Sequence, residues 1–424
     1  MNQLGVAIFV LSYVGIALGE IPGLALDRTG VALLGAMLMV ATETITFGQA
    51  TASIDAGTLV LLFGLMVLSA QFQLGGFYGA VALRAARSGL AARGFLGFVI
   101  AASAVLSALV SNDVVCLVMT PLVIEIVRRR GWNPVPFLLA LAAAANVGSA
   151  ATVIGNPQNM FIGQKAALDF ARFGLWCAPP SIASLALLYA WLARGGELES
   201  ERGGRPLARH DAADWPLDAG SMASARPFDR AQSAKAVVLT VVMVALFFTR
   251  VPREVSVLGV VAVLLMSRKL TTPRFLALVD WPLLLLFIGL FVLIEGFRLS
   301  GGMAALEALL ARSGLEIHRP AVLAVASVVL SNLVSNVPAV MLLMAEWPAN
   351  RPELAYLLAL TSTYAGNLLL IGSIANLIVA EQARAHGAEI GFALHARRIA
   401  PFAVASLAIA VAWWWGMLRL GVAG

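Results

Sequence analysis

The chain is dominated by apolar segments that are long enough to cross a lipid bilayer. A helix needs roughly 20 consecutive apolar residues to span the hydrocarbon core. The sequence predicts spanning helices at 4–21, 29–43, 56–74, 136–168, 173–193, 234–250, 254–267, 281–298, 355–382 and 399–419. These are continuous apolar runs rather than alternating apolar and polar residues, which favours helices over membrane strands. The expected fold class is therefore an all-α polytopic membrane protein.

The composition leads to the same class. The chain is 60% hydrophobic and only 12% charged, and its mean hydropathy is +0.89. A soluble domain of this size would expose far too much apolar surface. The net charge of +6 is expected to reflect basic loops on the cytoplasmic side, and no nucleic-acid partner is expected. The apolar start of the chain lacks the basic residues of a signal peptide and is expected to be a retained first helix.

The sequence contains one pattern twice. LSALVSN (106–112) returns as LSNLVSN (330–336), and IGNPQN (154–159) returns as IGSIAN (371–376). These matches keep their order and a nearly constant spacing, and they include polar residues, so chance similarity between apolar helices does not explain them. The pattern indicates a tandem duplication.

The duplication predicts three parts. The first repeat is expected at 1–193 and the second at 234–424, with a cytoplasmic linker at 194–233. The linker prediction rests on its Gly, Pro, Ser and mixed charges, which show no apolar period.

Polar residues interrupt the apolar run 95–127 near its middle. Ser111, Asn112 and Asp113 lie there together, although an aspartate at mid-bilayer costs about 2.5–3.5 kcal/mol on insertion scales. Arginines flank the run at both ends, so both ends are expected to stay in the cytoplasm. This favours a re-entrant hairpin whose tip carries the three polar residues, since non-helical backbone at membrane depth must be buried in protein or line a wet cavity.

A second interrupted run, 320–345, carries Ser335 and Asn336 at its middle and has fewer arginines beside it. It is expected to be the mirror-image hairpin, entering from the other side. Each repeat then has five full crossings, an odd number, so the repeats run in opposite directions. The prediction is an inverted repeat with both termini outside the cytoplasm.

Each hairpin is followed by a helix that glycine or proline interrupts, at 136–168 and at 355–382. Glycine frees the backbone and proline removes a donor. The new helix N-termini offer unpaired N–H groups and a partial positive charge, which favour an anion. In inverted-repeat transporters, such broken helices meet near the bilayer midplane and bind the solute there. The residues expected to line this site are Ser111, Asn112, Thr152, Gly155, Asn156, Asn159, Ser335, Asn336, Thr363, Asn367, Gly372, Ser373 and Asn376.

Two hairpins with Ser-Asn tips, each followed by a glycine-broken helix, resemble the ion transporter superfamily. This group includes divalent anion/sodium symporters, citrate-transporter-like permeases and arsenite-efflux permeases. SNDVVCLVMTP (111–121) and IGNPQN resemble the arsenite-permease and bacterial anion-permease branch most. The resemblance covers almost the whole chain. It implies an ion-coupled secondary active transporter in a bacterial inner membrane, with a homodimeric assembly. The implied solute is a di- or tricarboxylate, an inorganic oxyanion or arsenite.

The chain departs from the symporters at both tips. The symporters carry Ser-Asn-Thr, whereas Asp113 and Val337 stand at the threonine positions here. If sodium is the coupling ion, the resemblance places it among Ser111, Asn112, Asn156, Ser335 and Asn336. The favoured hypothesis is that Asp113 couples transport to H⁺. A helix-capping role for Asp113 is compatible with it.

Other hypotheses for the function stay open. An acidic hairpin tip also fits a cation/proton antiporter of the same superfamily. A membrane-embedded enzyme and a channel are the more distant alternatives. The sequence has no nucleotide-binding loop, metal-ligand cluster or nucleophile triad, so we expect neither enzyme activity nor a cofactor.

Cys116 and Cys177 are expected to be buried free thiols. Glu295 and Arg298 are expected to form a structural pair, and no chemistry is assigned to His395.

Overall fold

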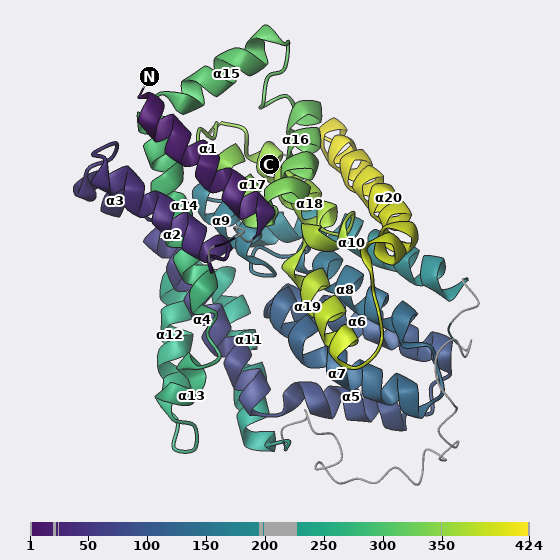
Figure 1. Cartoon of the computed structure of the whole chain (residues 1–424). Helices are drawn as coiled ribbons and strands as arrows, with labels where there is room; N and C mark the ends of the chain where they lie inside the picture. The colour runs from purple at the N-terminus through teal and green to yellow at the C-terminus, as the bar shows by residue number, and fades with distance from the viewer. Residues whose placement is uncertain are drawn as a thin grey trace.

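The computed structural model describes residues 2–19, 23, 25–194, 198, 227–348 and 350–422. Within these residues the chain is helical and contains no extended sheet (Figure 1). Six of the described helices are long and apolar enough to cross a membrane. The predicted all-α polytopic class is therefore confirmed.

The two halves of the chain contain the same order of elements. The first half contains α1 (Gln3–Leu18), α2 (Arg28–Ala41), α3 (Phe47–Ser53), α4 (Ala56–Leu74), α5 (Phe77–Arg87), α6 (Ala92–Leu109), α7 (Asn112–Arg129), α8 (Pro134–Ser149), α9 (Pro157–Lys165) and α10 (Phe170–Ala193). The second half contains α11 (Arg230–Phe247), α12 (Arg253–Leu265), α13 (Thr272–Leu276), α14 (Trp281–Leu299), α15 (Gly302–Arg312), α16 (Pro320–Val334), α17 (Asn336–Leu343), α18 (Pro352–Ala365), the 3₁₀ turn η1 (Leu370–Gly372), α19 (Ile374–Ala385) and α20 (Phe392–Arg419). Most of the predicted linker lies outside the described residues.

Equivalent elements lie at opposite ends of the molecule. The surface helices α5 and α15 cross the lower and the upper end of the view in Figure 1. Each follows a left-handed glycine, Gly76 with φ 68° and Gly301 with φ 78°, a conformation that costs glycine little. The long helices before them are capped alike, since Asp55 accepts from Thr58 N at 2.8 Å and Asp280 accepts from Leu283 N at 3.0 Å. The repeats are thus similar in detail and inverted in space.

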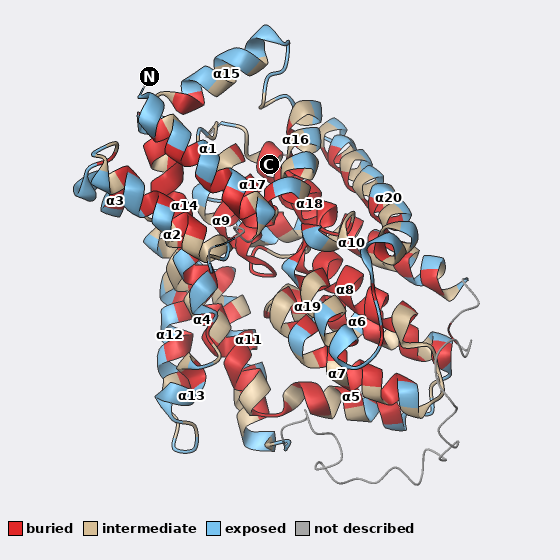
Figure 2. Ribbon diagram, in the orientation of Figure 1, coloured by how far each residue is buried: buried red, intermediate tan, exposed pale blue. Residues whose placement is uncertain are grey.

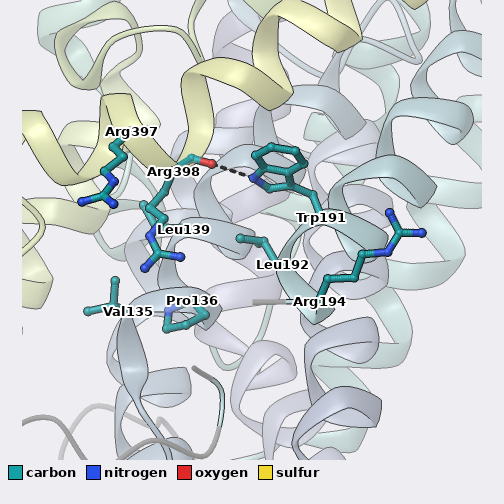
Figure 3. A pocket seen from close by; sticks show the side chains of 8 residues that line it. All are labelled: Val135, Pro136, Leu139, Trp191, Leu192, Arg194, Arg397 and Arg398. Atoms are coloured by element: carbon teal, nitrogen blue, oxygen red, sulfur yellow. Dashed lines mark hydrogen bonds between the residues drawn. The ribbon is translucent and has the colours of Figure 1, made fainter. Parts of the chain in front are cut away.

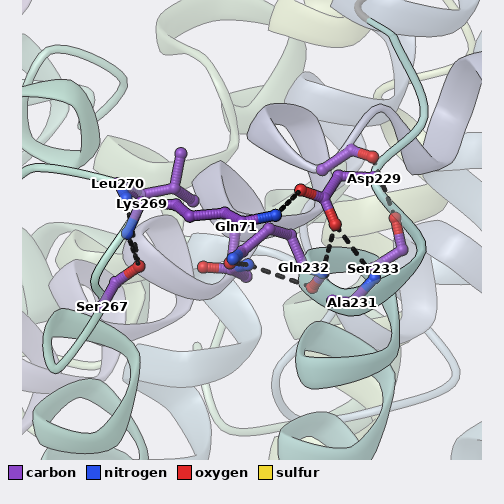
Figure 4. Close-up of polar contacts among 9 residues, drawn as sticks. Gln71, Asp229, Ala231, Gln232, Ser233, Ser267, Lys269 and Leu270 are labelled. Atoms are coloured by element: carbon purple, nitrogen blue, oxygen red, sulfur yellow. Dashed lines mark hydrogen bonds and ion pairs between the residues drawn. The ribbon is translucent and has the colours of Figure 1, made fainter.

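The halves are joined by a reciprocal contact between their first helices and the ends of α4 and α14. The backbone N–H of Asn2, the N-cap of α1, donates to Ser300 O at 2.9 Å. The backbone N–H of Asp229, the N-cap of α11, donates to Gly75 O at 3.0 Å, and Ser233 Oγ donates to the same carbonyl at 2.9 Å (Figure 4). Each half therefore caps part of the other.

Both predicted hairpins and both broken helices are present. Helix α6 packs along α7, and α16 packs along α17, although α6 alone is long enough to span a bilayer. Helices α8 and α18 end at unwound segments before α9 and α19 begin. Buried residues make up almost the whole of α8 and α18 in the centre of the molecule (Figure 2), as expected for helices that are apolar on every side.

The sequence prediction did not include the short helices α3, α5, α13 and α15. Each of them is much shorter than the roughly 20 apolar residues that a membrane span requires. All four lie at the ends of α4 and α14, where they turn the chain along the surface of the molecule.

Candidate functional site

The centre of the site is built from two unwound segments, 150–156 and 366–373. One asparagine holds each segment in place from the helix that follows. Asn159 Nδ2 donates to Ser149 O at 3.3 Å and to Thr152 O at 3.2 Å. Asn376 Nδ2 donates to the equivalent carbonyls, Gly366 O at 2.7 Å and Leu369 O at 3.4 Å. These amides satisfy carbonyls that the helix break releases, so their first role is to stabilise the break.

Asn146, in the last turns of α8, connects the two halves. Its Oδ1 accepts from Asn112 Nδ2 at 3.1 Å and from Ser373 Oγ at 2.9 Å. Its Nδ2 donates to Asn367 Oδ1 at 2.8 Å and to Asn376 Oδ1 at 3.2 Å. Asn146 is 1% exposed. One buried amide thus links the first hairpin tip to the second unwound segment.

Thr363 is the equivalent residue on α18 and makes the reciprocal connection. Its Oγ1 lies 3.4 Å from Asn156 Nδ2 and 3.3 Å from Gln158 Nε2. Asn156 also donates to Ser149 Oγ at 2.9 Å and caps α9 by accepting from Asn159 N at 2.9 Å. Each half therefore reaches into the break of the other, but the contact through Thr363 has fewer and longer hydrogen bonds.

The two hairpin tips place amide oxygens beside this network. Asn112 Oδ1 and Asn336 Oδ1 are buried and have no hydrogen-bond partner among the described residues, and the same is true of Asn159 Oδ1. Leaving such groups unpaired costs about 1–3 kcal/mol each. Acceptors left without donors inside a polar cluster are candidates for binding a solute or an ion.

The tip backbones differ. Ser111 is extended, with φ −168°, whereas Ser335 has φ 77° and ψ 162°, a region that a residue with a side chain rarely adopts. Backbone strain of this kind costs of order 1–3 kcal/mol and concentrates at functional sites. Both serines are half-buried and immediately precede a helix N-terminus.

Asp113 lies in the first turn of α7, next to the first tip, and is half-buried. It takes part in none of the ion pairs among the described residues. Its counterpart Val337 is buried and apolar. The helix N-terminus favours a carboxylate at this position, but the second half shows that the fold does not require one.

The glycines at the breaks allow close approach. A Cβ at Gly155 would lie 2.2 Å from Ser149 O, and a Cβ at Gly148 would lie 2.3 Å from Ala104 Cα. In the second half, a Cβ at Gly372 would lie 2.6 Å from Asn332 Oδ1. Both breaks are therefore closely packed, against backbone in the first half and against a side chain in the second.

The remaining predicted residues are placed as follows. Thr152 Oγ1 donates to Ala108 O, which ties the first break to hairpin α6–α7. Asn367 Nδ2 donates to Ala143 O at 3.4 Å. The structure therefore joins the predicted residues Asn112, Thr152, Asn156, Asn159, Thr363, Asn367, Ser373 and Asn376 in hydrogen bonds at or between the two breaks. For Ser111, Ser335 and Asn336 the structure shows position at the tips rather than contacts.

Three residues in or beside this cluster were missed by the sequence prediction. Asn146 lies in an alanine run, and a single amide among alanines could have indicated a polar site there. Asn332 is the one difference between the two LSxLVSN motifs, and its Nδ2 donates to Ala365 O at 3.1 Å. His395 was assigned no chemistry, but it is 2% exposed and a ring nitrogen lies 3.1 Å from Asn367 O. His395 therefore contacts the second break.

Two smaller cavities in the described part of the chain lie outside this cluster. One, of about 450 Å³, lies at the C-terminal ends of α9 and α14, where Glu295 and Arg298 form the predicted pair at 2.6 Å. The other, of about 530 Å³, is lined by Arg194, Arg397 and Arg398 around an apolar floor (Figure 3). Neither contains a residue of the central cluster. Cys116 and Cys177 are buried and free, as predicted, and no group of metal-ligating side chains occurs in the described part of the chain.

An all-helical membrane fold with inverted halves, broken helices and a central cluster of amides is the architecture of a membrane transporter. The comparison with known families agrees. Residues 13–349 match the family model described as citrate transporter (CitMHS), so the chain belongs to this family. The predicted resemblance to the ion transporter superfamily is confirmed, and the protein is a transporter rather than an enzyme.

Two relatives support this assignment, and a solved structure has the same fold. A silicon efflux transporter of rice, Oryza sativa subsp. japonica, is 32% identical over 86% of this chain and 87% of its own length. A putative transporter, arsB, of Dictyostelium discoideum is 26% identical over 91% of this chain and 86% of its own length. The crystal structure of the YdaH transporter of Alcanivorax borkumensis matches 99% of this chain and 98% of its own with a TM-score of 0.55 at 14% identity, which shows a shared fold.

Proposed function

We propose that the protein is an ion-coupled secondary active transporter of a small oxyacid or oxyanion, and that the solute binds between the two hairpin tips and the two unwound segments. The observation that carries the proposal is the central cluster. It offers N–H groups at the starts of α7, α9, α17 and α19 together with the unpaired oxygens of Asn112, Asn159 and Asn336. A solute with both acceptor and donor atoms satisfies both sets.

This chemistry favours a neutral or singly charged oxyacid over a fully ionised carboxylate. The side chains of the cluster are amides and hydroxyls, and none of those named above is a lysine or an arginine. A multiply charged anion would leave the unpaired oxygens facing like charge, whereas a protonated oxyacid can donate to them. The rice relative is named a silicon efflux transporter, which supports silicic acid as the first candidate. The resemblance to arsenite permeases adds arsenous acid, and the name of the matching family model adds citrate as the next candidate.

Alternating access is supported by unequal packing in the two halves. Helix α9 packs on α4 and α17 packs on α14, whereas the equivalent pairs α19–α14 and α7–α4 lack such packing. In an inverted repeat, exchanging the two arrangements yields the opposite state. Because the pairs on the side of α7 and α19 lack this packing, we infer that this side, which the arginine pattern predicts to be cytoplasmic, is the open one. The implied homodimer stays a prediction.

The test is a thermal-shift screen of the purified protein against silicic acid, arsenite, sulfate and citrate, with and without Na⁺ and at two pH values. A solute that binds the native state raises its stability, by about 2.7 kcal/mol at a hundredfold excess over Kd. Stabilisation by the oxyacids, followed by their flux in proteoliposomes, is the expected result. Stabilisation by citrate alone would move the substrate to carboxylates.

A cation/proton antiporter is the second candidate, because unpaired amide oxygens beside Asp113 also suit a small cation. The same screen separates the two functions. An antiporter would be stabilised by Na⁺ without any solute, and its proteoliposomes would exchange Na⁺ for H⁺.

A further inference from the structure

An apolar groove of about 750 Å³ separates α15 from hairpin α16–α17. Its walls include Leu306 and Leu310 of α15, Val325 and Val329 of α16, and Leu342 of α17. Val325 is 64% exposed, so one face of α16 is left without a protein neighbour.

The packing beside the hairpin differs between the two halves in the described part of the chain. In the first half α5 packs against α7, whereas the equivalent α15 makes no comparable contact with α16 or α17. In Figure 1, α15 projects from the upper end of the molecule, while α5 lies beneath α7. An open apolar groove of this size in a membrane protein is filled by whatever apolar material surrounds it, because water gains no hydrogen bonds there.

The length of the groove along α16 matches the thickness of one leaflet of the bilayer. The lining positions on α16 run from Ala321, near the start of that helix, to Leu330, close to the hairpin tip. Nine residues of helix rise by about 14 Å, and half of a hydrocarbon core is about 15 Å. A chain that lies along this face reaches from the surface to near the midplane, as a lipid tail does.

The rim of the groove is acidic. Glu307 and Glu346 line it, together with His318, and its lining includes no lysine or arginine. Such a rim attracts an ammonium group and repels a headgroup with net negative charge.

We propose that this groove binds one acyl chain of a phospholipid with an ammonium headgroup, such as phosphatidylethanolamine, with the headgroup at Glu307 and Glu346. The chain occupies the space that α5 and α7 fill by direct contact in the other half. The proposal does not depend on which solute is transported.

The test uses the full-length protein in membranes of equal phosphatidylethanolamine and phosphatidylglycerol that contain a phosphatidylethanolamine probe with a photoreactive group in its acyl chain. Mass spectrometry after illumination is expected to map the label to 303–346. Val325→Trp fills the groove and should lower this labelling about tenfold, which corresponds to a loss of about 1.4 kcal/mol of binding. Val241→Trp is the matched control, because Val241 is a valine of 62% exposure on α11, outside the groove. It should leave the labelling unchanged.

Two further variants keep the test decisive. Leu310→Trp fills the groove from the α15 wall and should reproduce the loss if Val325→Trp folds poorly. Glu307→Gln combined with Glu346→Gln should reduce the preference for phosphatidylethanolamine several-fold over an equivalent phosphatidylglycerol probe. Labelling spread evenly over the membrane-facing surface would overturn the proposal. So would labelling that survives both tryptophans, or crosslinks from the groove to a second copy of the chain.

Discussion

The two breaks of this protein share their supports and differ in their contacts with each other. In both halves an asparagine, Asn159 or Asn376, donates to the same two carbonyls of the unwound segment. The residues that connect the two halves differ. The side chain of Asn146 on α8 makes four hydrogen bonds, whereas the equivalent Thr363 on α18 makes two. Positions that keep a break open are therefore common to both repeats, and the positions that connect the repeats are not.

The two hairpin tips also share some residues and differ in others. A Ser-Asn pair is present at both, but only the first is followed by a carboxylate, Asp113, and only the second has a strained serine, Ser335. A scaffold with inverted symmetry can alternate between equivalent states, whereas vectorial coupling to an ion needs a difference between the sides. The divergent residues are where that difference should be sought.

The largest expected effect is a steric loss of stability, which should differ between the two breaks. Gly155→Ala places a methyl group against the Ser149 backbone, while Gly372→Ala places one against the Asn332 side chain. We expect Gly155→Ala to destabilise the protein by about 3 kcal/mol or more and Gly372→Ala by about 1 kcal/mol, since a side chain can move. Thermal unfolding in detergent measures both. Adding Asn332→Ala should relieve Gly372→Ala only, and equal losses for the two glycines would show that the breaks are equally rigid.

The next effect concerns the connecting residues. Asn146→Ala removes the shared partner of Asn112, Asn367, Ser373 and Asn376. We expect a cost of about 2 kcal/mol, within the range for one unpaired buried group, because the freed groups lie close enough to pair with one another. Thr363→Ala removes only the two longer contacts and should cost about 1 kcal/mol. Unfolding by heat, compared for the two variants at one protein concentration, checks the order. A more damaging Thr363→Ala would place the main connection between the halves elsewhere.

The hairpin tips should affect transport more than stability. Asn112→Ala and Asn336→Ala each remove an amide oxygen that has no partner in the described protein. Losing a hydrogen bond to a solute typically costs about 1.5–3 kcal/mol when charge is involved, or ten- to a hundredfold in affinity. Solute uptake by proteoliposomes is the readout, with the amount of inserted protein as the control. Normal uptake by either variant would remove that tip from the site.

Asp113→Asn should leave binding nearly unchanged and alter coupling. Asparagine keeps the shape and can still cap a helix, so the variant tests the charge alone. We expect exchange of solute down its gradient to continue while the response to an imposed proton gradient is lost. Val337→Asp, which puts a carboxylate at the second tip, is the matched experiment. If Asp113→Asn keeps the wild-type dependence on the gradient, the carboxylate acts as part of the helix start and another group carries the ion.

The smallest effect is expected for the orientation of the first hairpin. Single cysteines at Arg93, in the first turn of α6, and at Arg128, in the last turn of α7, should both be labelled from the cytoplasm with little change in transport. Both residues are exposed. Labelling from opposite sides would mean that this segment spans the membrane, and the inverted relation of the halves would fail.

Much of this architecture could be predicted because membrane burial leaves strong signals. Apolar length identified the spans, arginine placement identified the hairpin, and the glycine and proline breaks marked where backbone is released. The repeat itself indicated which polar residues to pair. Helix α4 begins and ends at the predicted residues 56 and 74 because Asp55 is its cap and a glycine follows its last residue.

The contacts within the site were harder to predict, because they join segments distant in sequence. Nothing in the alanine run around Asn146 indicates that its amide meets Asn367 and Asn376 of the other half. The contact of His395 with Asn367 could not be predicted, because the two residues lie in different elements and His395 is close to a helix start rich in arginine. Its burial depends on where α20 crosses the second break.

The reciprocal caps at Asn2 and Asp229 have a consequence for biosynthesis. The Asn2 N–H pairs with Ser300 O, and Gly75 O accepts from Asp229 and Ser233, so neither repeat contains all its own partners. During translation the first repeat inserts long before Ser300 leaves the ribosome, and during that interval its first helix lacks a docking partner. Isolated halves, or chains stopped before α14, should therefore remain substrates for membrane quality control, and the two repeats should mature together only when the second has been made.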